Sequence, residues 1–493
     1  MLPADRAALS LIARAAFSNP FSREREAIDA EIAGSPGAVA RDDLVERALL
    51  GVSDILARID RPGRVSLDSF RGEDRRLLRF TILFDAFHAF ADDFDRLIER
   101  QIAAGDNPVP VPFARDVADR LASRGFSPEE SVRYVSVFFQ LRRAFYFIHR
   151  GLVGNSPSMV ALRARLWNNV FTHDAGFYDE CLWNRMEDFS TLLLGETGCG
   201  KGAAAAAIGQ SAYIPFDPAR GRFAESFTKS FLSLNLCQYP DSLVESELFG
   251  HKKGAFTGAV SDYSGAFSRC SPHGCVFLDE IGDVGVPVQV KLLQVVQNRV
   301  FSPVGGHERE RFSGRLIAAT NRPLDQLRKT GAFRDDFFYR ISSDVVRLPS
   351  LRQRLAEDPA EFRLLVEHVV ARIAGPAESD LPARVEKSLL DRPGIAHPWP
   401  GNVRELEQAI RRVILAGAYD APLPPADLPA ENALACEFLR GNLKADDLLS
   451  RYCSILFDRF GTYEEVARRA GIDRRTAKKH VLRAASSGNP HPA

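Results

Sequence analysis

Cysteine is scarce in this chain of 493 residues, and its seven cysteines are irregularly spaced. A disulfide framework or a zinc site needs paired or regular spacings, so the sequence indicates neither and suits a reducing cytoplasm. Cys270 and Cys275 form a close pair without a second pair or histidines at ligand spacing. We interpret these two residues as part of the core.

The chain also lacks an excess of either charge, because 64 Lys and Arg residues balance 64 Asp and Glu residues. Net charge therefore gives no argument for a polyanionic partner, and any nucleic-acid surface has to be local. Long apolar runs are missing as well. Charges interrupt the apolar patterns of residues 1–17 and 132–153, so we expect neither a secretory signal nor a membrane span.

Hydrophobic residues make up 45% of the chain, and the length is typical of about three domains. Residues 1–150 carry apolar residues at spacings of three and four, which predicts a helical N-terminal domain. A stripe of aromatic residues in this region is expected to be core rather than a ligand pocket: Phe80, Phe84, Phe87, Phe90 and Phe94.

The remaining sequence predicts a multidomain fold. Apolar runs at 191–194, 230–235, 276–278 and 316–319 alternate with helical stretches, so residues 151–345 are expected to form an α/β subdomain with a mostly parallel sheet. We predict a small helical lid at 346–420, a Pro-rich linker at 421–437, and an all-α module at 438–493.

A phosphate-binding loop is indicated where the first apolar run ends and a helical Ala-rich run begins. Its residues are Gly195, Glu196, Thr197, Gly198, Cys199, Gly200, Lys201 and Gly202. Backbone amides of such a loop cradle nucleotide phosphates, and Lys201 neutralises the terminal ones. The loop predicts binding of ATP and Mg²⁺. Gly202 stands where a Ser or Thr hydroxyl usually binds magnesium, so the rate of ATP turnover is in question.

Two carboxylates, Asp279 and Glu280, end the run of residues 275–278, where a parallel sheet places its ligands. We interpret Asp279 as the Mg²⁺ partner and Glu280 as the base that polarises the attacking water. A solvated acidic pair at a strand end is the alternative, and the phosphate loop favours the catalytic interpretation.

Between these motifs lies a stretch of small residues around one aromatic: Gly254, Ala255, Phe256, Thr257, Gly258 and Ala259. It resembles the GAFTGA loop of bacterial enhancer-binding proteins, the AAA+ ATPases that act on sigma-54 RNA polymerase. The resemblance implies a mobile finger that presents Phe256 to sigma-54. A glycine-rich hairpin with a buried Phe is the alternative.

The resemblance runs from about residue 153 to 415 and implies further roles. Asn321, after the run 315–320, would position water, and Asn235 would restrain Glu280. Arg334 and Arg340 would be arginine fingers inserted into a neighbouring subunit, although alone they could be solvated partners of Asp335 or Asp336.

The same resemblance covers the motif 399–406, in which Arg404 would reach back to the nucleotide and Asn402 would cap a helix. The segment 172–190 before the phosphate loop is an unusual feature, expected to shape the adenine pocket or a subunit contact. Residues 1–150 lack the pattern of a phosphorylated receiver, so their signal stays open.

The C-terminal stretch 462–481 has helix-turn-helix spacing and resembles the Fis-like domain that ends enhancer-binding proteins. Ala467, Gly471, Ile472 and Val481 are expected in its core. Basic and polar residues of the second helix are expected to contact DNA, unless that helix is merely solvated: Arg474, Arg475, Thr476, Lys478 and Lys479.

The resemblance thus implies a cytoplasmic, sigma-54-dependent activator with no membrane contact. It would bind promoter-upstream double-stranded DNA and remodel the closed complex of sigma-54 RNA polymerase holoenzyme, as a hexameric ring, possibly built from dimers. The alternative is a DNA-binding regulator that keeps the AAA+ fold for assembly and hydrolyses ATP poorly. Gly202 invites this alternative, whereas Phe256, Glu280 and both arginines oppose it.

Overall fold

The computed structural model describes residues 3–34, 41–59, 66–375, 380–391, 397–419 and 444–486. The chain divides into two compact units, 1–419 and 420–493, and each is described by itself. Within the described ranges, no helix combines the length and apolar character needed to cross a membrane. The linker predicted at 421–437 lies outside the described residues.

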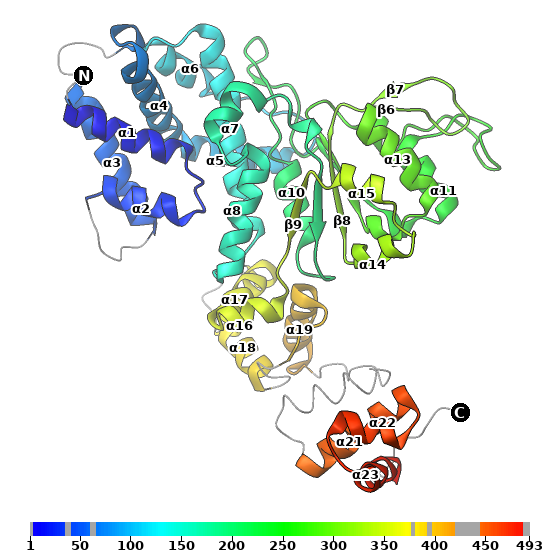
Figure 1. The fold of residues 1–493 in the computed structure, drawn as a ribbon. Helices are drawn as coiled ribbons and strands as arrows, with labels where there is room; N and C mark the ends of the chain where they lie inside the picture. Colours follow the sequence, from blue (N-terminus) through cyan, green and yellow to red (C-terminus); the bar gives the residue numbers. More distant parts are fainter. Residues whose placement is uncertain are drawn as a thin grey trace. The chain divides into compact units, whose positions relative to one another are not determined.

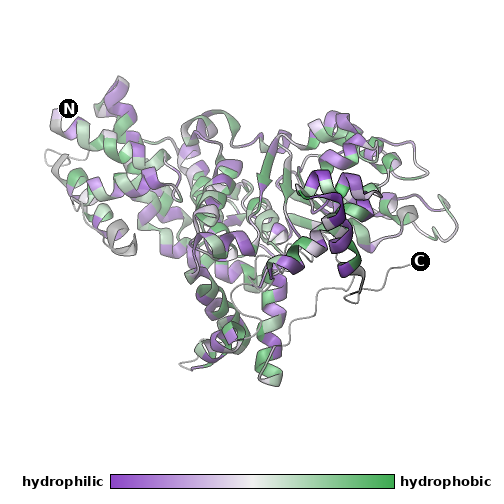
Figure 2. Cartoon of the chain, turned by 60° about the horizontal axis from the view of Figure 1, so that its bottom comes forward, coloured by the Kyte–Doolittle hydropathy of each residue, from purple (hydrophilic) through white to green (hydrophobic). Residues whose placement is uncertain are grey.

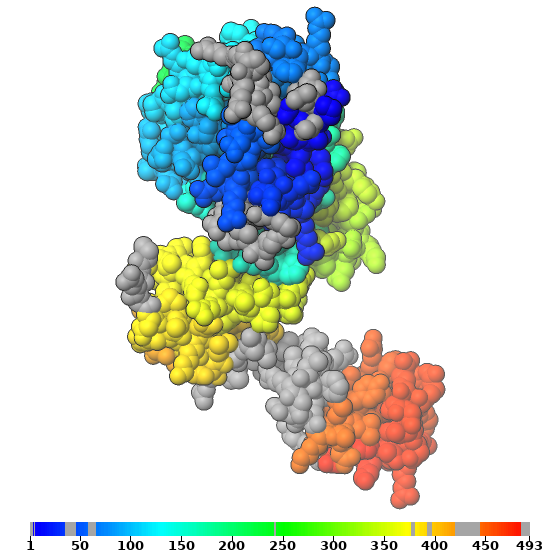
Figure 3. Space-filling view, turned by 90° about the vertical axis from the view of Figure 1, so that its left-hand side faces the viewer, coloured from blue at the N-terminus to red at the C-terminus, as the bar shows by residue number. Residues whose placement is uncertain are grey.

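The first part of the larger unit is helical, as its periodicity predicts (Figure 1). Its helices are α1 (Pro3–Phe17), α2 (Arg23–Ile32), α3 (Arg41–Ile59), α4 (Gly72–Ala89), α5 (Ala91–Ala104), α6 (Ala114–Ala122) and α7 (Pro128–Gly151). The chain leaves the helical conformation at Phe90, which separates α4 from α5. These helices, dark blue to cyan, gather on the face seen in Figure 3.

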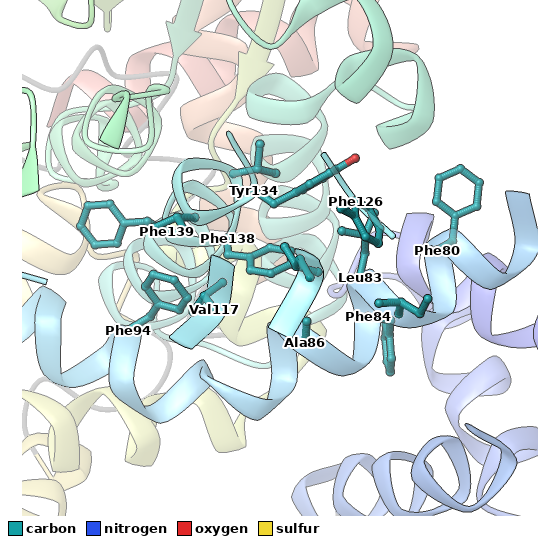
Figure 4. Packing of buried hydrophobic residues seen from close by; sticks show 14 of the residues in the cluster. Phe80, Leu83, Phe84, Ala86, Phe94, Val117, Phe126, Tyr134, Phe138 and Phe139 are labelled. Carbon is teal, nitrogen blue, oxygen red and sulfur yellow. The ribbon is translucent and has the colours of Figure 1, made fainter. Parts of the chain in front are cut away.

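The phenylalanine stripe lies in the core of this region, as expected (Figure 4). Phe80, Phe84 and Phe94 are buried, and Phe87 and Phe90 pack partly buried against the same cluster. Rings from α4 and α5 meet rings from α7, so the stripe is a helix–helix interface.

A five-stranded parallel sheet follows, with the order β4-β5-β8-β1-β9. Its strands are β1 (Thr191–Leu194), β4 (Phe231–Asn235), β5 (Cys275–Asp279), β8 (Arg315–Thr320) and β9 (Asp344–Arg347). Four of them match the predicted runs. β9 was missed and crosses the boundary predicted between 345 and 346, because its two valines between charged residues form too short an apolar run.

Helices cover the sheet, and in Figure 2 they mix hydrophilic and hydrophobic residues, as expected of helices with one buried face. They are α8 (Pro157–Phe171), α10 (Lys201–Gly209), α11 (Asp241–Phe249), α12 (Ala266–Arg269), α13 (Val286–Asn298), α14 (Leu324–Lys329) and α15 (Asp335–Ile341). Two hairpins are formed by β2 (Phe216–Asp217) with β3 (Arg222–Phe223) and by β6 (Val300–Phe301) with β7 (Glu310–Arg311).

Within its described residues, the predicted lid contains four helices: α16 (Leu351–Glu357), α17 (Ala360–Ala374), α18 (Leu381–Asp391) and α19 (Asn402–Ala416). The helical N-terminal region and the α/β region also share a core. Ile214, Phe223 and Phe227 belong to the same buried cluster as the rings of α4 to α7. Removal of residues 1–150 would therefore expose apolar surface of the α/β region.

The smaller unit contains α21 (Ala445–Phe460), α22 (Tyr463–Ala470) and α23 (Arg474–Ser486) among its described residues. Val481 is buried and Ala467 and Ile472 are partly buried in its core, as predicted. Gly471 is exposed instead, because it ends α22 in the left-handed conformation with φ +68°. The sequence missed Cys453, Val466 and Ala477 in this core.

Candidate functional site

The loop between β1 and α10 depends on glycines. Gly198 has φ +78° and Gly200 has φ +105°, a conformation that L side chains rarely adopt. A Cβ at Gly198 would also collide with the carbonyl oxygen of Gly401 in the lid. The loop thus runs close under the lid, with backbone N–H groups at the start of α10 available to an anion.

Lys201 is the first residue of α10, and its side chain is buried. Its Nζ donates to the carbonyl oxygens of Gly195 at 3.0 Å and of Glu196 at 3.3 Å. The ammonium is therefore held inside the loop, where phosphate oxygens could replace the carbonyls as acceptors. Gly202 has open space where a side chain would stand.

The two predicted carboxylates lie at the end of β5. Glu280 takes a left-handed backbone conformation with φ +58°, which is uncommon for a residue with a side chain and is found at functional sites. Its Oε2 accepts from the backbone N–H of Asn321 at 3.3 Å, and the Asn321 side-chain amide donates to Thr197 Oγ1 at 2.7 Å. The structure thereby brings together residues from the ends of β5 and β8 and the phosphate loop.

Asn235 ends β4 opposite Asp279, so it reaches the same edge of the sheet. Its Oδ1 accepts from the backbone N–H of Cys237 at 3.1 Å and caps a short helical turn. Among the described residues it makes no hydrogen bond to Glu280. The expected restraint of Glu280 by Asn235 is therefore absent from this arrangement, because Asn235 satisfies the backbone instead.

Asn402 does not cap α19 as expected, since Gly401 occupies that position. Its fully buried side chain instead joins the lid to the phosphate loop. The amide donates to the carbonyl oxygen of Thr197 at 3.0 Å and to Glu196 Oε2 at 3.2 Å, and Oδ1 accepts from the backbone N–H of Leu351 at 2.7 Å. Asn402 therefore links the lid to the loop by hydrogen bonds and positions the lid over it.

Arg352 of α16 provides a second link, because it pairs with Glu196 through both guanidinium nitrogens. This bidentate hydrogen bonding lowers the pKa of the Glu196 carboxyl. Arg404, exposed at the start of α19, has no hydrogen-bond or ion-pair partner within the described part of the chain, and it lies beside Gly198. Its guanidinium is thus available to a ligand, and its contact with a nucleotide stays a prediction.

Residues of the phosphate loop, of the β5 end and of the lid line one cavity of about 390 Å³. Lys201, Asp279, Glu280 and Arg404 lie at its polar part. Its apolar part is formed by Leu152, Val153, Met159, Leu365 and Val369. A polar part for phosphates and an apolar part for a base together match a nucleotide. Residues 172–190 are not in this lining, so their expected role in an adenine pocket is not supported.

The stretch 254–259 folds back on itself rather than extending. The backbone N–H of Gly254 donates to the carbonyl oxygen of Ala259 at 2.9 Å, and Ala259 is buried. Phe256 is partly buried, with its ring edge-on to His251 at 4.9 Å between centroids. The ring thus packs against His251 in this arrangement, and its presentation to a partner stays a prediction.

Comparison with known proteins decides the family of this region. Residues 180–347 match the family model of the sigma-54 interaction domain, and residues 357–435 match that of the AAA+ ATPase lid domain. The chain carries a sigma-54 interaction domain. The sheet, the phosphate loop and the withdrawn Phe256 all lie in this domain.

Curated relatives match the same part of the chain. The Nif-specific regulatory protein of Azotobacter vinelandii is 40% identical over 230 residues, which are 47% of this chain and 40% of that protein. The regulatory protein AtoC of Escherichia coli is 36% identical over 268 residues, which are 52% of this chain and 54% of AtoC. The DNA-binding transcriptional activator HyfR of Escherichia coli is 40% identical over 228 residues, which are 46% of this chain and 31% of HyfR.

The chain thus spans about a third to a half of the length of these relatives. Among solved structures, NtrX from Brucella abortus is 23% identical, with a TM-score of 0.40 over 75% of this chain and 80% of that chain.

The two predicted finger arginines lie on the sigma-54 interaction domain but away from its own cavity lining. Arg334 precedes α15 and pairs with Asp336 at 2.7 Å, as the alternative interpretation expected. That partner raises the pKa of the Arg334 guanidinium. Arg340 is exposed and has no partner among the described residues.

In the smaller unit, the predicted DNA-contacting residues are not equivalent. Arg474 pairs with Glu464 at 2.7 Å, and the Thr476 hydroxyl donates to Asp473 Oδ2 at 2.6 Å. Thr476 is thus occupied in the turn that starts α23. Arg475 and Lys479 are exposed and make no ion pair with any described residue, while Lys478 lies over the ring of Tyr463.

Three features of the site do not follow from the sequence: the link that Asn402 makes between lid and loop, the pair of Arg352 with Glu196, and the apolar lining from 152–159 and α17. Apolar residues and salt bridges carry no motif of their own. For the lid, the sequence does contain one signal. Asn402 follows Trp-Pro-Gly, and if such an Asn is buried, its amide needs a hydrogen-bond partner.

Proposed function

We propose that the chain is a sigma-54-dependent transcription activator that binds promoter-upstream DNA. It uses ATP hydrolysis in a ring to remodel the closed complex of sigma-54 RNA polymerase into an open complex. The observation that carries this proposal is the cavity between phosphate loop and lid, because it gathers Lys201, Asp279 and Glu280 in a sigma-54 interaction domain.

The cavity fits ATP, with the base in the apolar part and the phosphates along the loop. Lys201 and Arg404 would neutralise phosphate charge, and the start of α10 would bind phosphate oxygens through backbone N–H groups. Glu280 would accept the proton of the attacking water. Asn321, whose N–H already meets Glu280, would hold that water in line.

Mg²⁺ is compatible with the residues present. The Asp279 carboxylate lines the cavity, and Mg²⁺ commonly binds through one or two carboxylates together with substrate phosphates and water. When bound, the ion neutralises charge on the phosphates. Gly202 offers no hydroxyl, so Asp279 is the expected protein ligand.

A ring is proposed because the finger arginines do not line the cavity of their own chain. Arg334 and Arg340 would act at the cavity of a neighbouring subunit, where they stabilise charge that develops on the transferred phosphoryl group. Arg334 would first have to leave Asp336. Both groups are exposed, so this exposed pair is weak and its exchange is feasible.

ATP hydrolysis would act on sigma-54 through movement of the loop that contains Phe256. The partly buried position of Phe256 against His251 defines a withdrawn state, and nucleotide-dependent movement would release the ring toward sigma-54. His251 also hydrogen-bonds Ser246 of α11 at 2.7 Å through Nδ1, so the base of the loop is tied to the α/β core.

The rival function is a DNA-binding regulator that assembles but hydrolyses little ATP, and Gly202 is the observation that favours it. Steady-state phosphate release from wild type and Glu280→Gln separates the two. The activator proposal expects wild type to exceed the variant by about 100-fold or more. A wild-type rate no higher than that of Glu280→Gln would leave only the passive role.

DNA binding is proposed for α23, with Arg475 and Lys479 as the basic residues available there. Replacing both by Ala should weaken binding to promoter-upstream DNA and reduce the salt slope by about 2 if each contacts a phosphate. Fluorescence anisotropy against salt concentration measures this. Arg459→Ala on α21 is a matched control, and an equal effect there would remove α23 as the DNA surface.

A further inference from the structure

A second cavity, of about 500 Å³, lies outside the nucleotide site and shares no lining residue with it. It is bounded by the first half of α4, by Arg133 of α7, and by the segment that precedes β1. Gly72 from the start of α4 and Trp183 from that segment both line it. The cavity therefore lies between the N-terminal helices and the chain that leads into the phosphate loop.

Four arginines line this cavity against two carboxylates, Asp179 and Glu180. Arg79 pairs with Glu130 at 2.9 Å, and Arg133 pairs with Asp179 at 2.8 Å. The other two arginines, Arg75 and Arg76, are exposed on α4 and form no ion pair with any described residue. A concave surface with unpaired guanidinium groups attracts anions.

Three of the four guanidinium groups lie over aromatic rings. Arg79 lies 4.9 Å from the ring centre of Phe126, and Arg133 lies 4.6 Å from that of Tyr134. Arg76 lies 5.6 Å from the ring centre of Phe80. Such stacking fixes the planar forks that match carboxylate and phosphate oxygens, and it lowers the entropic cost of binding.

The cavity also offers apolar surface. Phe80 and Trp183 both line it. The ring of Trp183 meets Tyr213 at 4.7 Å between centroids and the Arg133 guanidinium at 5.7 Å, and it remains only partly buried. A ligand that is only an anion would leave this surface unused. A flat, apolar body attached to the anionic groups would cover it.

We propose that this cavity binds a small organic anion with a flat ring and two negative charges, as carboxylates or as a phosphate. Arg75 and Arg76 would hold the charges while Trp183 contacts the ring. The site adjoins a chain of hydrogen bonds to the end of α10. Tyr178 donates to Gln140 Oε1 at 2.8 Å, and Gln140 donates to the carbonyl oxygen of Ser211 at 3.0 Å.

The test is isothermal titration calorimetry of the full chain with phthalate and, separately, with phenyl phosphate, each up to about 10 mM. The two probes share the ring and the dianion but differ in the anionic group, so they distinguish a carboxylate from a phosphate ligand. We expect saturable binding of at least one probe. The variant with Arg75→Ala and Arg76→Ala should bind it at least about tenfold more weakly.

Controls locate the binding. Arg100→Ala removes an exposed arginine of α5 and should leave the affinity unchanged, whereas Trp183→Ala should weaken it. Binding should persist in Lys201→Ala, which alters the nucleotide cavity. The proposal is overturned by absence of saturable binding of both probes, by equal affinity in the Arg75 and Arg76 double variant, or by loss of binding in Lys201→Ala. None of these outcomes depends on ATP turnover.

Discussion

Arg143 of α7 donates from Nη1 to the carbonyl oxygen of Gln210 at 2.6 Å, at the end of the helix that begins in the phosphate loop. Its Nη2 donates to the carbonyl oxygen of Ala212 at 2.7 Å. The guanidinium is fully buried, and burial lowers its pKa to about 9. A charge on the N-terminal helices thus satisfies carbonyls at the far end of α10, where a cation is favoured.

Replacing Arg143 by Met should destabilise the fold, because two partly buried carbonyls lose a charged donor. We expect the free energy of unfolding to fall by about 2–5 kcal/mol. Chemical denaturation measures the loss, and hydrogen exchange should increase in residues 206–212. Arg100→Ala, which removes an exposed arginine, should change stability by less than about 0.5 kcal/mol. Equal stability of wild type and Arg143→Met would contradict the role of this cap.

Asn402→Ala should loosen the lid, since the amide joins Thr197 and Glu196 to the lid and Oδ1 holds the N–H of Leu351. We expect the KM for ATP to rise by about tenfold or more and stability to fall by about 1–3 kcal/mol. Gln408→Ala, an exposed change on the same helix, is the control. An unchanged KM in Asn402→Ala would show that the hydrogen bonds of Asn402 do not position the lid.

Gly202→Thr should raise the affinity of the nucleotide site for Mg²⁺. A Cβ at Gly202 meets no atom within 4 Å, so the side chain fits, and the new hydroxyl can bind the metal ion. We expect the Mg²⁺ concentration for half-maximal ATP turnover to fall by severalfold. Gly202→Val, which has a similar shape without the hydroxyl, should leave it unchanged. The same shift in both variants would mean that helix stability, not metal binding, is responsible.

His88 should make stability depend on pH. Burial lowers the pKa of its imidazole from 6.5 to about 3, with Arg25 and Arg142 acting in the same direction. Below pH 6.5 the unfolded chain therefore binds a proton that the folded chain does not, so stability falls as pH falls from 6.5 toward 3.

Urea unfolding of wild type and His88→Leu at pH 7 and pH 5 tests this sign. The wild-type loss between these pH values should exceed that of the variant by up to about 2 kcal/mol. Whatever pH dependence remains in His88→Leu belongs to other groups. An equal or larger loss in the variant would contradict a neutral His88 in the folded chain.

The sequence was sufficient for features set by local chemistry. The glycines of the phosphate loop, the carboxylates at the end of β5 and the helix-turn-helix spacing each have a local physical reason, so they could be predicted. The parallel sheet also followed, because its buried strands form continuous apolar runs.

Features set by distant contacts could not be predicted. Asn402 was expected to cap its own helix, but its partners lie about 50 and 200 residues away in the sequence. Phe256 was expected outside the fold, and its packing on His251 depends on how the loop closes. Arg143 looked like an interruption of an apolar helix, because nothing in the sequence links it to the end of α10.

The central claim is that the nucleotide bound in the cavity between the phosphate loop and the lid controls whether Phe256 binds sigma-54. Co-sedimentation of the chain with purified sigma-54, with and without ADP and aluminium fluoride as a transition-state mimic, tests it most directly. We predict a complex only with the mimic, retained in Val260→Ala, whose side chain is 80% exposed in the same loop, and lost in Phe256→Ala. A wild-type protein that binds no sigma-54 with the mimic present, or a Phe256→Ala variant that binds as well as wild type, would contradict the account.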